Sequence, residues 1–330
     1  MNQTIAKWAV NGKRLWRRAV FILVGNVVQE KRKRLLVTGA SGFLGWHACF
    51  FGRDSWRVFG VVHDHRIEME GVCVVRADLT RPTQVKRLVQ ETAPDAVLHL
   101  AAASQPNLCQ LEPEKTRRIN VDASLTLAGL ASEGSIPYVF TSSDLVFDGR
   151  KAPYREEDPV SPVSAYGEQK AQAEVGILDC HPDAIICRMP LLFGDPRSTS
   201  QNILQSMIGK LKEGGELRLF TDEYRTPLSV RDAVRGLFLA LEKARGLLHL
   251  GGRERISRYD FGRLVVEILG QGDARLVPCL QKDVPMAAAR PPDVSLDSSR
   301  AFALGFTPRV LRNELKHLLE GYSFPSQRKR

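Results

Sequence analysis

The stretch TGASGFLG, residues 38–45, places three glycines, Gly39, Gly42 and Gly45, directly after a short apolar run at 35–37. Glycines let a chain turn sharply and let peptide N–H groups approach a pyrophosphate, and the start of a following helix adds its dipole to that attraction. We therefore predict a phosphate-binding turn between a first strand and a first helix. A turn used only for packing is the less favoured alternative, because the chain that follows has a matching strand–helix–strand rhythm.

From Arg34 onward, short apolar runs alternate with longer segments of helical period. The predicted strands cover residues 35–38, 58–63, 72–76, 96–100, 138–142 and 184–188, and predicted helices include 83–91 and 117–131. Strand, helix and strand repeated in this way require right-handed crossovers and a parallel sheet with helices on both faces. The sequence therefore predicts an α/β fold with a doubly wound parallel sheet of the Rossmann type.

Beyond residue 190 the rhythm loosens, and proline and glycine recur between the elements. Helices are predicted at 201–212, 230–243, 259–269 and 312–319, and short strands at 217–220, 247–250 and 275–278. We interpret residues 34–190 together with 228–252 as a dinucleotide-binding domain. Residues 191–227 together with 253–325 are interpreted as a smaller, C-terminal substrate-binding lobe.

The formal net charge of +10 is concentrated at the N-terminus. Residues 1–34 contain nine Lys or Arg and one acidic residue, whereas the rest of the chain is close to neutral, so we expect no nucleic-acid partner. Residues 1–33 are interpreted as a basic extension that is disordered. The apolar run at 19–28 is shorter than the roughly 20 residues that span a bilayer, and an anchor at a membrane surface is the less favoured use of this segment.

Cysteine and histidine usage bears on location and on metals. The six cysteines show no C-x-x-C pairing, and the seven histidines have no ligand spacing. We predict small buried thiols in a reducing compartment, hence a cytoplasmic protein, and no transition-metal site. The sequence leaves open whether a divalent ion of the magnesium type binds and whether the chain forms a homodimer.

The residues after the second predicted strand bear on the choice of cofactor. An acidic residue at this position would hold the ribose hydroxyls of NAD, but the chain has His63, then Asp64, His65 and Arg66. His63 and Arg66 suit a 2′-phosphate, whereas Asp64, one position late, could still reach the ribose. We therefore favour NADP(H) over NAD(H).

Two further strand ends supply candidate cofactor residues. Asp78 and Leu79 follow the third predicted strand, where folds of this kind contact adenine. The run HLAAAS, residues 99–104, puts small side chains at the end of the fourth strand. Small residues there leave room for a cofactor, although packing explains the alanines nearly as well.

The stretch YGEQK, residues 166–170, puts Tyr166 and Lys170 on one face of a predicted helix. A phenol has a reference pKa of about 10 and is a poor acid at neutral pH unless a neighbouring ammonium favours its phenolate. Lys170 is placed to do this and to hydrogen-bond a nicotinamide ribose, so that Tyr166 could donate a proton to a carbonyl oxygen as hydride arrives. Ser143, at the end of the fifth strand, is preferred over Ser142 as the hydroxyl that orients this carbonyl.

Residues 34 to about 322 resemble an extended short-chain dehydrogenase/reductase, and within that group the dTDP-4-dehydrorhamnose reductase family. Besides the glycine turn, the resemblance rests on TSSDLVFDG (141–149), NVDAS (120–124), AYGEQK (165–170) and ARPPDVSLDSSRAFALGF (289–306). It implies reduction of a 4-keto nucleotide sugar with NADPH or NADH by a serine, tyrosine and lysine triad. It also places Arg290 near a substrate diphosphate, a task that suits a guanidinium, with Arg225 as a weaker candidate.

The candidate residues divide by the role expected of them. The catalytic candidates are Ser143, Tyr166 and Lys170; the cofactor-binding candidates are Gly39, Ser41, Gly42, Phe43, Leu44, Gly45, His63, Asp64, Arg66, Asp78, Leu79, Leu100, Ala101, Ala102, Ser142, Tyr166 and Lys170; and the substrate-binding candidates are Ser143, Asp144, Arg225 and Arg290.

Two departures from the family pattern affect the choice of substrate. Leu145 and Leu192 stand where the family often has an aromatic side chain, which weakens the case for dTDP-4-dehydrorhamnose without affecting hydride transfer. A 4,6-dehydratase is disfavoured, because it would need Glu rather than Leu145 after Asp144. A nucleotide-sugar 4-epimerase of the same fold and a non-catalytic NADP-binding regulatory subunit are the alternatives.

Overall fold

A seven-stranded parallel sheet forms the centre of the computed structural model, which describes residues 32–195 and 202–322. Its strand order is β11-β6-β5-β4-β1-β2-β3, and every neighbouring pair is parallel. The strands are β1 (Arg34–Thr38), β2 (Arg57–Val62), β3 (Val72–Arg76), β4 (Ala96–His99), β5 (Tyr138–Ser143), β6 (Ile185–Met189) and β11 (Gly246–His249).

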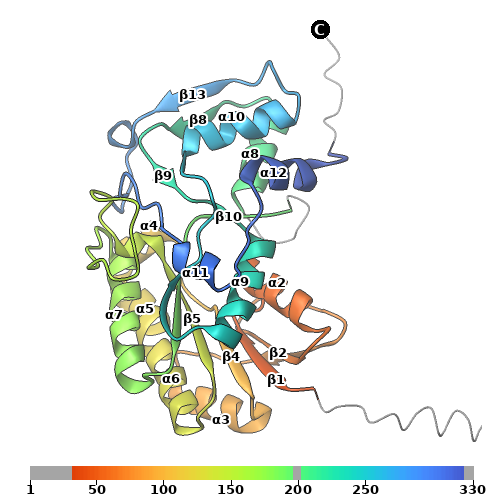
Figure 1. Cartoon of the computed structure of the whole chain (residues 1–330), viewed down its shortest axis with the longest axis vertical. Helices are drawn as coiled ribbons and strands as arrows, with labels where there is room; N and C mark the ends of the chain where they lie inside the picture. Colours follow the sequence, from red (N-terminus) through yellow and green to blue (C-terminus); the bar gives the residue numbers. More distant parts are fainter. Residues whose placement is uncertain (1–31, 196–201, 323–330) are drawn as a thin grey trace, which may run out of the picture. The chain divides into compact units, whose positions relative to one another are not determined.

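Helices cover both faces of this sheet, as Figure 1 shows. On one face α2 (Phe43–Gly52) and α9 (Val230–Lys243) pack their apolar sides on the strands, where Cys49 and Leu237 join a core that includes Leu35. On the other face the apolar sides of α3 (Pro82–Thr92), α6 (Ala123–Glu133) and α7 (Ala165–Cys180) enclose a second core around Phe140. The sheet is therefore buried on both sides, as parallel sheets require.

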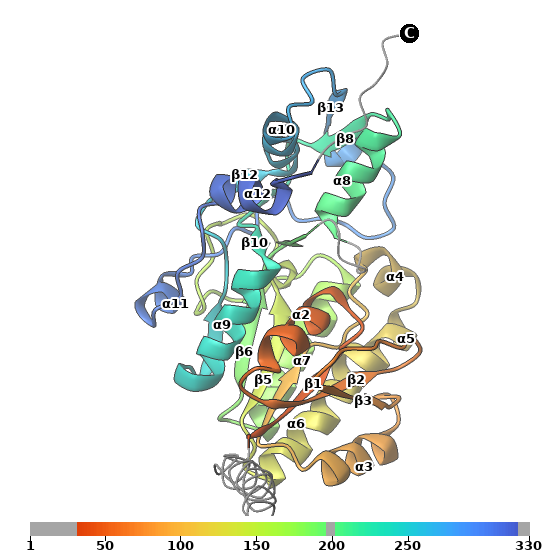
Figure 2. The same cartoon turned by 90° about the vertical axis from the view of Figure 1, so that its right-hand side faces the viewer.

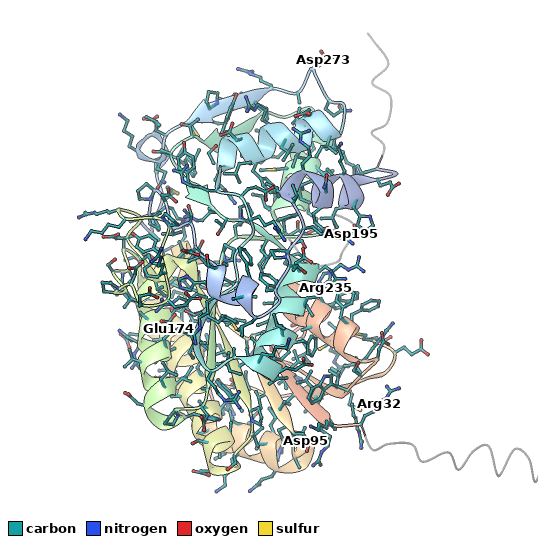
Figure 3. The ribbon with its side chains drawn as sticks, viewed as in Figure 1. Arg32, Asp95, Glu174, Asp195, Arg235 and Asp273 are labelled. Atoms are coloured by element: carbon teal, nitrogen blue, oxygen red, sulfur yellow. The ribbon has the colours of Figure 1, made fainter. Side chains whose placement is uncertain are left out.

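All seven strands end at the same edge of the sheet because they are parallel. The connections run to opposite sides from β1, towards β2 and β3 in one direction and towards β4 and β5 in the other. A crevice forms outside the carboxyl ends at such a switch point, and ligands bind there in this class of fold. Figure 3 shows Asp95, directly before β4, at the opposite end of the sheet from Asp195, which follows β7 (Leu192–Phe193).

A second group of elements lies beyond the carboxyl edge of the sheet (Figure 2). Its strands β8 and β13 pair in parallel, and its helices share a separate apolar core around Phe261. The elements of this part and its connections are α8 (Ile203–Lys212), β8 (Leu217–Phe220), β9 (Tyr224–Arg225), β10 (Leu228–Ser229), β12 (Ile256–Ser257), α10 (Arg258–Ile268), β13 (Leu276–Cys279), α11 (Ser299–Ala303) and α12 (Leu311–Leu319).

The predicted fold class is confirmed, and the predicted strands of the sheet match the observed ones to within a residue at each end. The sequence did not anticipate α4 (Pro106–Leu111) or α5 (Pro113–Arg117), and the helix predicted at 117–131 covers both the π-helical turn η1 (Arg118–Asp122) and most of α6, although its π form was not predicted. The short 3₁₀ turns η2 (Asp144–Val146) and η3 (Gln281–Asp283) were also not predicted. The chain from Arg34 onward forms one compact unit, and its division into two lobes stays a prediction.

The expectations for the N-terminal extension, for membrane-spanning helices and for the cysteines have different outcomes. The predictions for the N-terminal extension fall on residues that, apart from 32 and 33, lie outside the described part of the chain. Among the described helices, none has the length and apolar character needed to cross a bilayer. All six cysteines are free thiols, but Cys73 and Cys180 are exposed, so the prediction that the thiols are buried is wrong for these two.

Candidate active site

The glycine turn between β1 and α2 has no room for side chains at two of its positions. Gly39 has a φ of +70°, and a Cβ there would lie 2.9 Å from the backbone nitrogen of Ala101. A Cβ on Gly45 would lie 2.1 Å from the carbonyl oxygen of Gly39. No side chain caps the first turn of α2, and Gly42, Phe43 and Leu44 at this helix start line the cavity described below. These are the features of an anion-binding helix start.

A buried histidine holds this turn against the end of β4. The Thr38 hydroxyl oxygen accepts hydrogen bonds from the backbone N–H groups of Leu100 and Ala101, so its own proton must go to Nδ1 of His99, 2.8 Å away. Nε2 of His99 therefore carries the ring proton and donates it to Ser124, at 2.9 Å. Burial lowers the pKa of His99 to about 3, which keeps the ring neutral and this arrangement fixed at physiological pH.

A cavity of about 1080 Å³ runs along the carboxyl edge of the sheet. With one exception, every candidate residue named from the sequence lines it: Gly39, Ser41, Gly42, Phe43, Leu44, Gly45, His63, Asp64, Asp78, Leu79, Leu100, Ala101, Ala102, Ser142, Ser143, Asp144, Tyr166, Lys170, Arg225 and Arg290. The exception is Arg66, which is exposed and does not line this cavity. Residues far apart in the sequence thus converge on one hollow.

The candidate triad lies at one wall of this cavity. Ser143 ends β5, and its hydroxyl interacts with the phenol of Tyr166 on α7 and with the carboxylate of Asp144, at 3.1 Å. Lys170 lies one helical turn after Tyr166, and its Nζ is 6.0 Å from the centre of the phenol ring. Nζ also donates a hydrogen bond of 2.8 Å to the carbonyl oxygen of Thr141 and lies 4.4 Å above the ring of Phe140.

Burial dominates the ionisation of all three titratable groups beside Ser143. Burial first, and then the charge of Asp144, raises the pKa of Tyr166, whereas the sequence led us to expect a lowering by Lys170. Burial lowers the pKa of Lys170 to about 8, partly offset by Glu174. Burial also raises the pKa of Asp144 to about 6 against the opposing effect of Arg225. At neutral pH the phenol keeps its proton, and Lys170 is mostly an ammonium.

One glycine brings the tyrosine helix to the serine. Ser164 caps α7 by accepting a hydrogen bond from the N–H of Gly167, and a Cβ on Gly167 would lie 2.1 Å from the carbonyl oxygen of Leu145. The first turn of α7 therefore packs backbone against backbone on η2, directly after Ser143. This close approach holds Tyr166 within reach of Ser143.

Asn120 fixes the other side of the same helix and was assigned no role from the sequence. Its side-chain nitrogen donates to Gln169 at 2.7 Å and to the carbonyl oxygen of Ala103 at 3.1 Å, and its oxygen accepts from the N–H of Ala103 at 2.9 Å. Asn120 lies in the π-helical turn η1, a distortion often found at functional sites. The NVDAS likeness was the only sequence signal that pointed to it.

The far end of the cavity, towards the second group of elements, carries several charges. Arg225 is buried, and each nitrogen of its guanidinium group has a partner within the protein. Its Nε lies 3.4 Å from Asp144, its Nη2 lies 3.4 Å from Glu223, and its Nη1 donates to the carbonyl oxygen of Pro291. Arg258, which the sequence did not single out, lines the same end. Its Nη1 is buried and has no hydrogen-bond partner among the described residues, so a bound anion could supply one.

The two departures from the family pattern both face this cavity. Leu145, after Ser143 and Asp144, and Leu192, in β7, belong to its lining. A branched aliphatic side chain cannot stack on a planar base or sugar face as an aromatic ring does. At these two positions the cavity is therefore lined by aliphatic side chains, where the family often has aromatic ones.

A nicotinamide dinucleotide fits the residues that are present. The start of α2, which no side chain caps, lines the cavity, and the buried Ser142 hydroxyl, which has no partner among the described residues, lines it as well. Within the described ranges, no group of three or more His, Cys, Asp and Glu side chains is arranged to hold a metal ion.

The parallel sheet, the glycine turn and the serine, tyrosine and lysine on one cavity wall define an extended short-chain dehydrogenase/reductase fold. The family model described as the RmlD substrate binding domain matches residues 33–324, and the chain belongs to this family.

Relatives and solved structures agree with this placement. The chain is 28% identical over 284 residues to methionine adenosyltransferase 2 subunit beta of Danio rerio, covering 83% of this chain and 86% of that protein. It is 30% identical over 295 residues to a probable low-salt glycan biosynthesis reductase of Haloferax volcanii, covering 87% and 97%. A dTDP-4-dehydrorhamnose reductase ortholog from Clostridium acetobutylicum superimposes with a TM-score of 0.76 at 27% identity, covering 87% of this chain and 98% of that one. The dTDP-4-dehydrorhamnose reductase of Bacillus anthracis, solved in complex with NADP, has the same fold at 21% identity, with a TM-score of 0.76 and coverage of 88% and 99%.

Proposed function

We propose that this protein reduces the 4-keto group of a nucleotide sugar with NAD(P)H, with NADP(H) as the preferred cofactor. The observation that carries the proposal is the placement of the Tyr166 phenol, paired with Ser143 and one turn from Lys170, in the same cavity as the glycine turn. The resemblance to dTDP-4-dehydrorhamnose reductases, including one at 27% identity, supports the reaction class.

Each residue of the triad has a distinct task in this reaction. Bound NAD(P)H supplies the hydride that reaches the carbonyl carbon. Tyr166, which is protonated at neutral pH, donates its proton to the carbonyl oxygen, and the Ser143 hydroxyl donates a hydrogen bond that orients this oxygen. The Lys170 ammonium stabilises the phenolate that Tyr166 becomes and holds the nicotinamide ribose.

The rest of the cavity divides between the two ligands. The N–H groups of the glycine turn bind the pyrophosphate, while His63 and Asp78 border the adenosine. Arg258 and Arg290 face the substrate diphosphate, and Arg225, behind them, holds Asp144 in place beside Ser143. The elements beyond the carboxyl edge thus act as the substrate-binding lobe. Free thiols at all six cysteines support a cytoplasmic location.

The test follows the absorbance of NADPH and of NADH in the presence of dTDP-4-dehydrorhamnose. We expect oxidation by the natural protein and a fall of about a hundredfold to ten-thousandfold in kcat for Tyr166→Phe, which removes the donated proton. Tyr259→Phe is the matched control, because Tyr259 lies on α10 outside the cavity. Equal rates for Tyr166→Phe and the natural protein would remove the phenol from the mechanism.

A second function has a specific observation behind it. The likeness to methionine adenosyltransferase 2 subunit beta covers 83% of this chain, so a regulatory subunit that binds NADP(H) without turnover is the alternative. Such a subunit would bind NADPH, consume none with any keto sugar, and change the kinetics of an added methionine adenosyltransferase. The proposed reductase would consume NADPH and leave that enzyme unchanged.

A further inference from the structure

A buried ion pair joins the helix that carries Tyr166 and Lys170 to the central sheet. Glu174 lies on α7 and Arg188 on β6, and the two residues are only 4% and 2% exposed (Figure 3). Nε of Arg188 donates to Oε1 of Glu174 at 3.0 Å, and its Nη2 donates to Oε2 at 2.8 Å, so the contact is bidentate. No step of the proposed reaction uses this pair.

The third nitrogen of the Arg188 guanidinium is also held. Nη1 donates to the carbonyl oxygen of Glu156 and to Nε2 of His249, each at 3.4 Å. Nδ1 of His249 faces the carbonyl oxygen of Tyr154 at 3.1 Å and therefore carries the ring proton, which leaves Nε2 as an acceptor. Burial lowers the pKa of His249 to about 3, so the ring stays neutral at physiological pH. The guanidinium is thus fixed in the orientation that meets Glu174.

Glu174 follows Lys170 by one helical turn and Tyr166 by two, on the same side of α7. Nζ of Lys170 is held by a single hydrogen bond to the carbonyl oxygen of Thr141, at 2.8 Å, and by the ring of Phe140. Burial lowers the pKa of Lys170 to about 8, and the charge of Glu174 is first among the effects that oppose burial. The pair therefore acts on the ammonium as well as on the helix.

The other titratable groups around Lys170 are neutral at physiological pH. Burial raises the pKa of the Cys109 thiol on α4, and His99 on β4 is an uncharged ring. The phenol of Tyr166, on the same helix, keeps its proton. Of the groups that act on Lys170 in the described part of the chain, Glu174 is thus the one that carries a negative charge at this pH.

We propose that Glu174, fixed by Arg188, is a positioning residue that holds Lys170 in place and keeps it charged, so that this buried pair sets the upper pH limit of the reaction. The inference rests on the proposed function, in which the ammonium of Lys170 stabilises the phenolate of Tyr166. A pair that only anchored α7 on β6 would contribute to stability and leave the titration of Lys170 where it is.

The first measurement follows the titration of Lys170 by NMR and needs no turnover. The full chain is labelled with carbon-13 at the ε position of lysine, and the signal of Lys170 is identified by its absence from Lys170→Arg. We expect a midpoint of about pH 8 in the natural protein and a midpoint about one pH unit lower in Glu174→Gln, which removes the charge and keeps the shape. Glu174→Asp, which keeps the charge, should remain within about half a unit of the natural protein.

Glu168→Gln is the matched control. Glu168 lies in the first turn of the same helix, is exposed and does not line the cavity, so the same loss of charge should leave the midpoint of Lys170 unchanged. Because Glu174→Gln leaves Arg188 buried without its counter-charge, the double variant Glu174→Met with Arg188→Met is measured as well; replacing a buried ion pair by apolar side chains is often tolerated. It should also lower the midpoint. An unchanged midpoint in either variant would overturn the proposal.

The second measurement is the pH dependence of kcat/KM with NADPH and dTDP-4-dehydrorhamnose. The decline at alkaline pH should begin about one pH unit lower in Glu174→Gln than in the natural protein, and close to its natural place in Glu174→Asp. A limit that does not move with the NMR midpoint would contradict the proposal.

The two measurements separate this inference from the proposed function. A lowered midpoint in Glu174→Gln, with no turnover by any of the proteins, would support the action of Glu174 on Lys170 and contradict the reductase. Turnover that is lost in Tyr166→Phe, with a midpoint that Glu174→Gln leaves unchanged, would support the reductase and contradict the role of the pair.

Discussion

Tyr166 and Lys170 show that burial sets the ionisation of a candidate catalytic pair, whereas sequence spacing can only locate the two residues. The spacing correctly put both side chains on one helical face, and both line the cavity. The expectation that Lys170 lowers the pKa of Tyr166 does not describe this structure, because burial raises it. A sequence carries no measure of desolvation, so the direction of the shift became visible only with the fold.

The pKa of Lys170 predicts an alkaline limit to activity. Because burial lowers this pKa to about 8, the ammonium is present below that pH and lost above it. We expect kcat/KM to fall about tenfold per pH unit well above pH 8. Lys170→Arg, whose side chain keeps its charge, should have lower activity but no such decline. A decline that persists in Lys170→Arg would assign it to another group.

The buried pair of Arg225 and Asp144 predicts a pH-dependent loss of stability. Arg225→Met leaves the carboxylates of Asp144 and Glu223 without this guanidinium, and breaking a buried pair costs about 3–5 kcal/mol. The folded pKa of Asp144, raised to about 6, lies above its unfolded value, so its contribution to stability is present at low pH and declines as the pH rises towards 6.

Removing Arg225 raises that pKa further and extends the decline to higher pH. Denaturant unfolding of the variant should therefore show a larger loss of free energy at pH 8 than at pH 5. An equal loss at both pH values would mean that Asp144 is not charged in the folded protein. Arg263→Met is the control, because Arg263 is 67% exposed and surface pairs contribute little.

At the level of elements, the unit β5–η2–α7 brings the candidate triad together by close backbone packing. The sequence predicted the end of the strand and the helix that carries YGEQK. It did not show that Gly167 is the contact point, since that depends on how η2 and α7 approach each other. The elements α4 and α5 were missed for a related reason: these short helices begin at Pro106 and Pro113, and no apolar period of useful length marks them.

Gly167→Ala tests this packing against Gly129→Ala, a glycine in α6 with no atom near its absent side chain. The new Cβ at 167 would collide with the carbonyl oxygen of Leu145 and push Tyr166 away from Ser143. We expect a loss of about 1–3 kcal/mol in unfolding free energy and at least a tenfold lower kcat. Gly129→Ala should gain about 0.5–1 kcal/mol with unchanged kcat. Normal kcat in Gly167→Ala would contradict the packing argument.

At the level of the whole molecule, periodicity predicted the sheet, its doubly wound character and the edge at which the site lies. Most candidate residues could be named because parallel strands end at one edge, so that strand-end residues must meet. Arg258, Glu223 and Asn120 escaped notice because they reach the cavity or its supporting helix through tertiary contacts between distant segments. Arg66 was expected to bind the cofactor but does not line the cavity, because a position after a strand does not fix where a long side chain lies.

The central claim is that this cavity brings a reduced nicotinamide to a keto sugar beside Tyr166. The most direct measurement uses NADPH with two deuterium atoms at carbon 4 of the nicotinamide, together with dTDP-4-dehydrorhamnose, and analyses the sugar by mass spectrometry and NMR. We expect one deuterium at carbon 4 of the product sugar, and at least about a hundredfold less labelled sugar when Tyr166→Phe replaces the natural protein over the same time. NADPH that binds tightly yet transfers no deuterium to the sugar would contradict it.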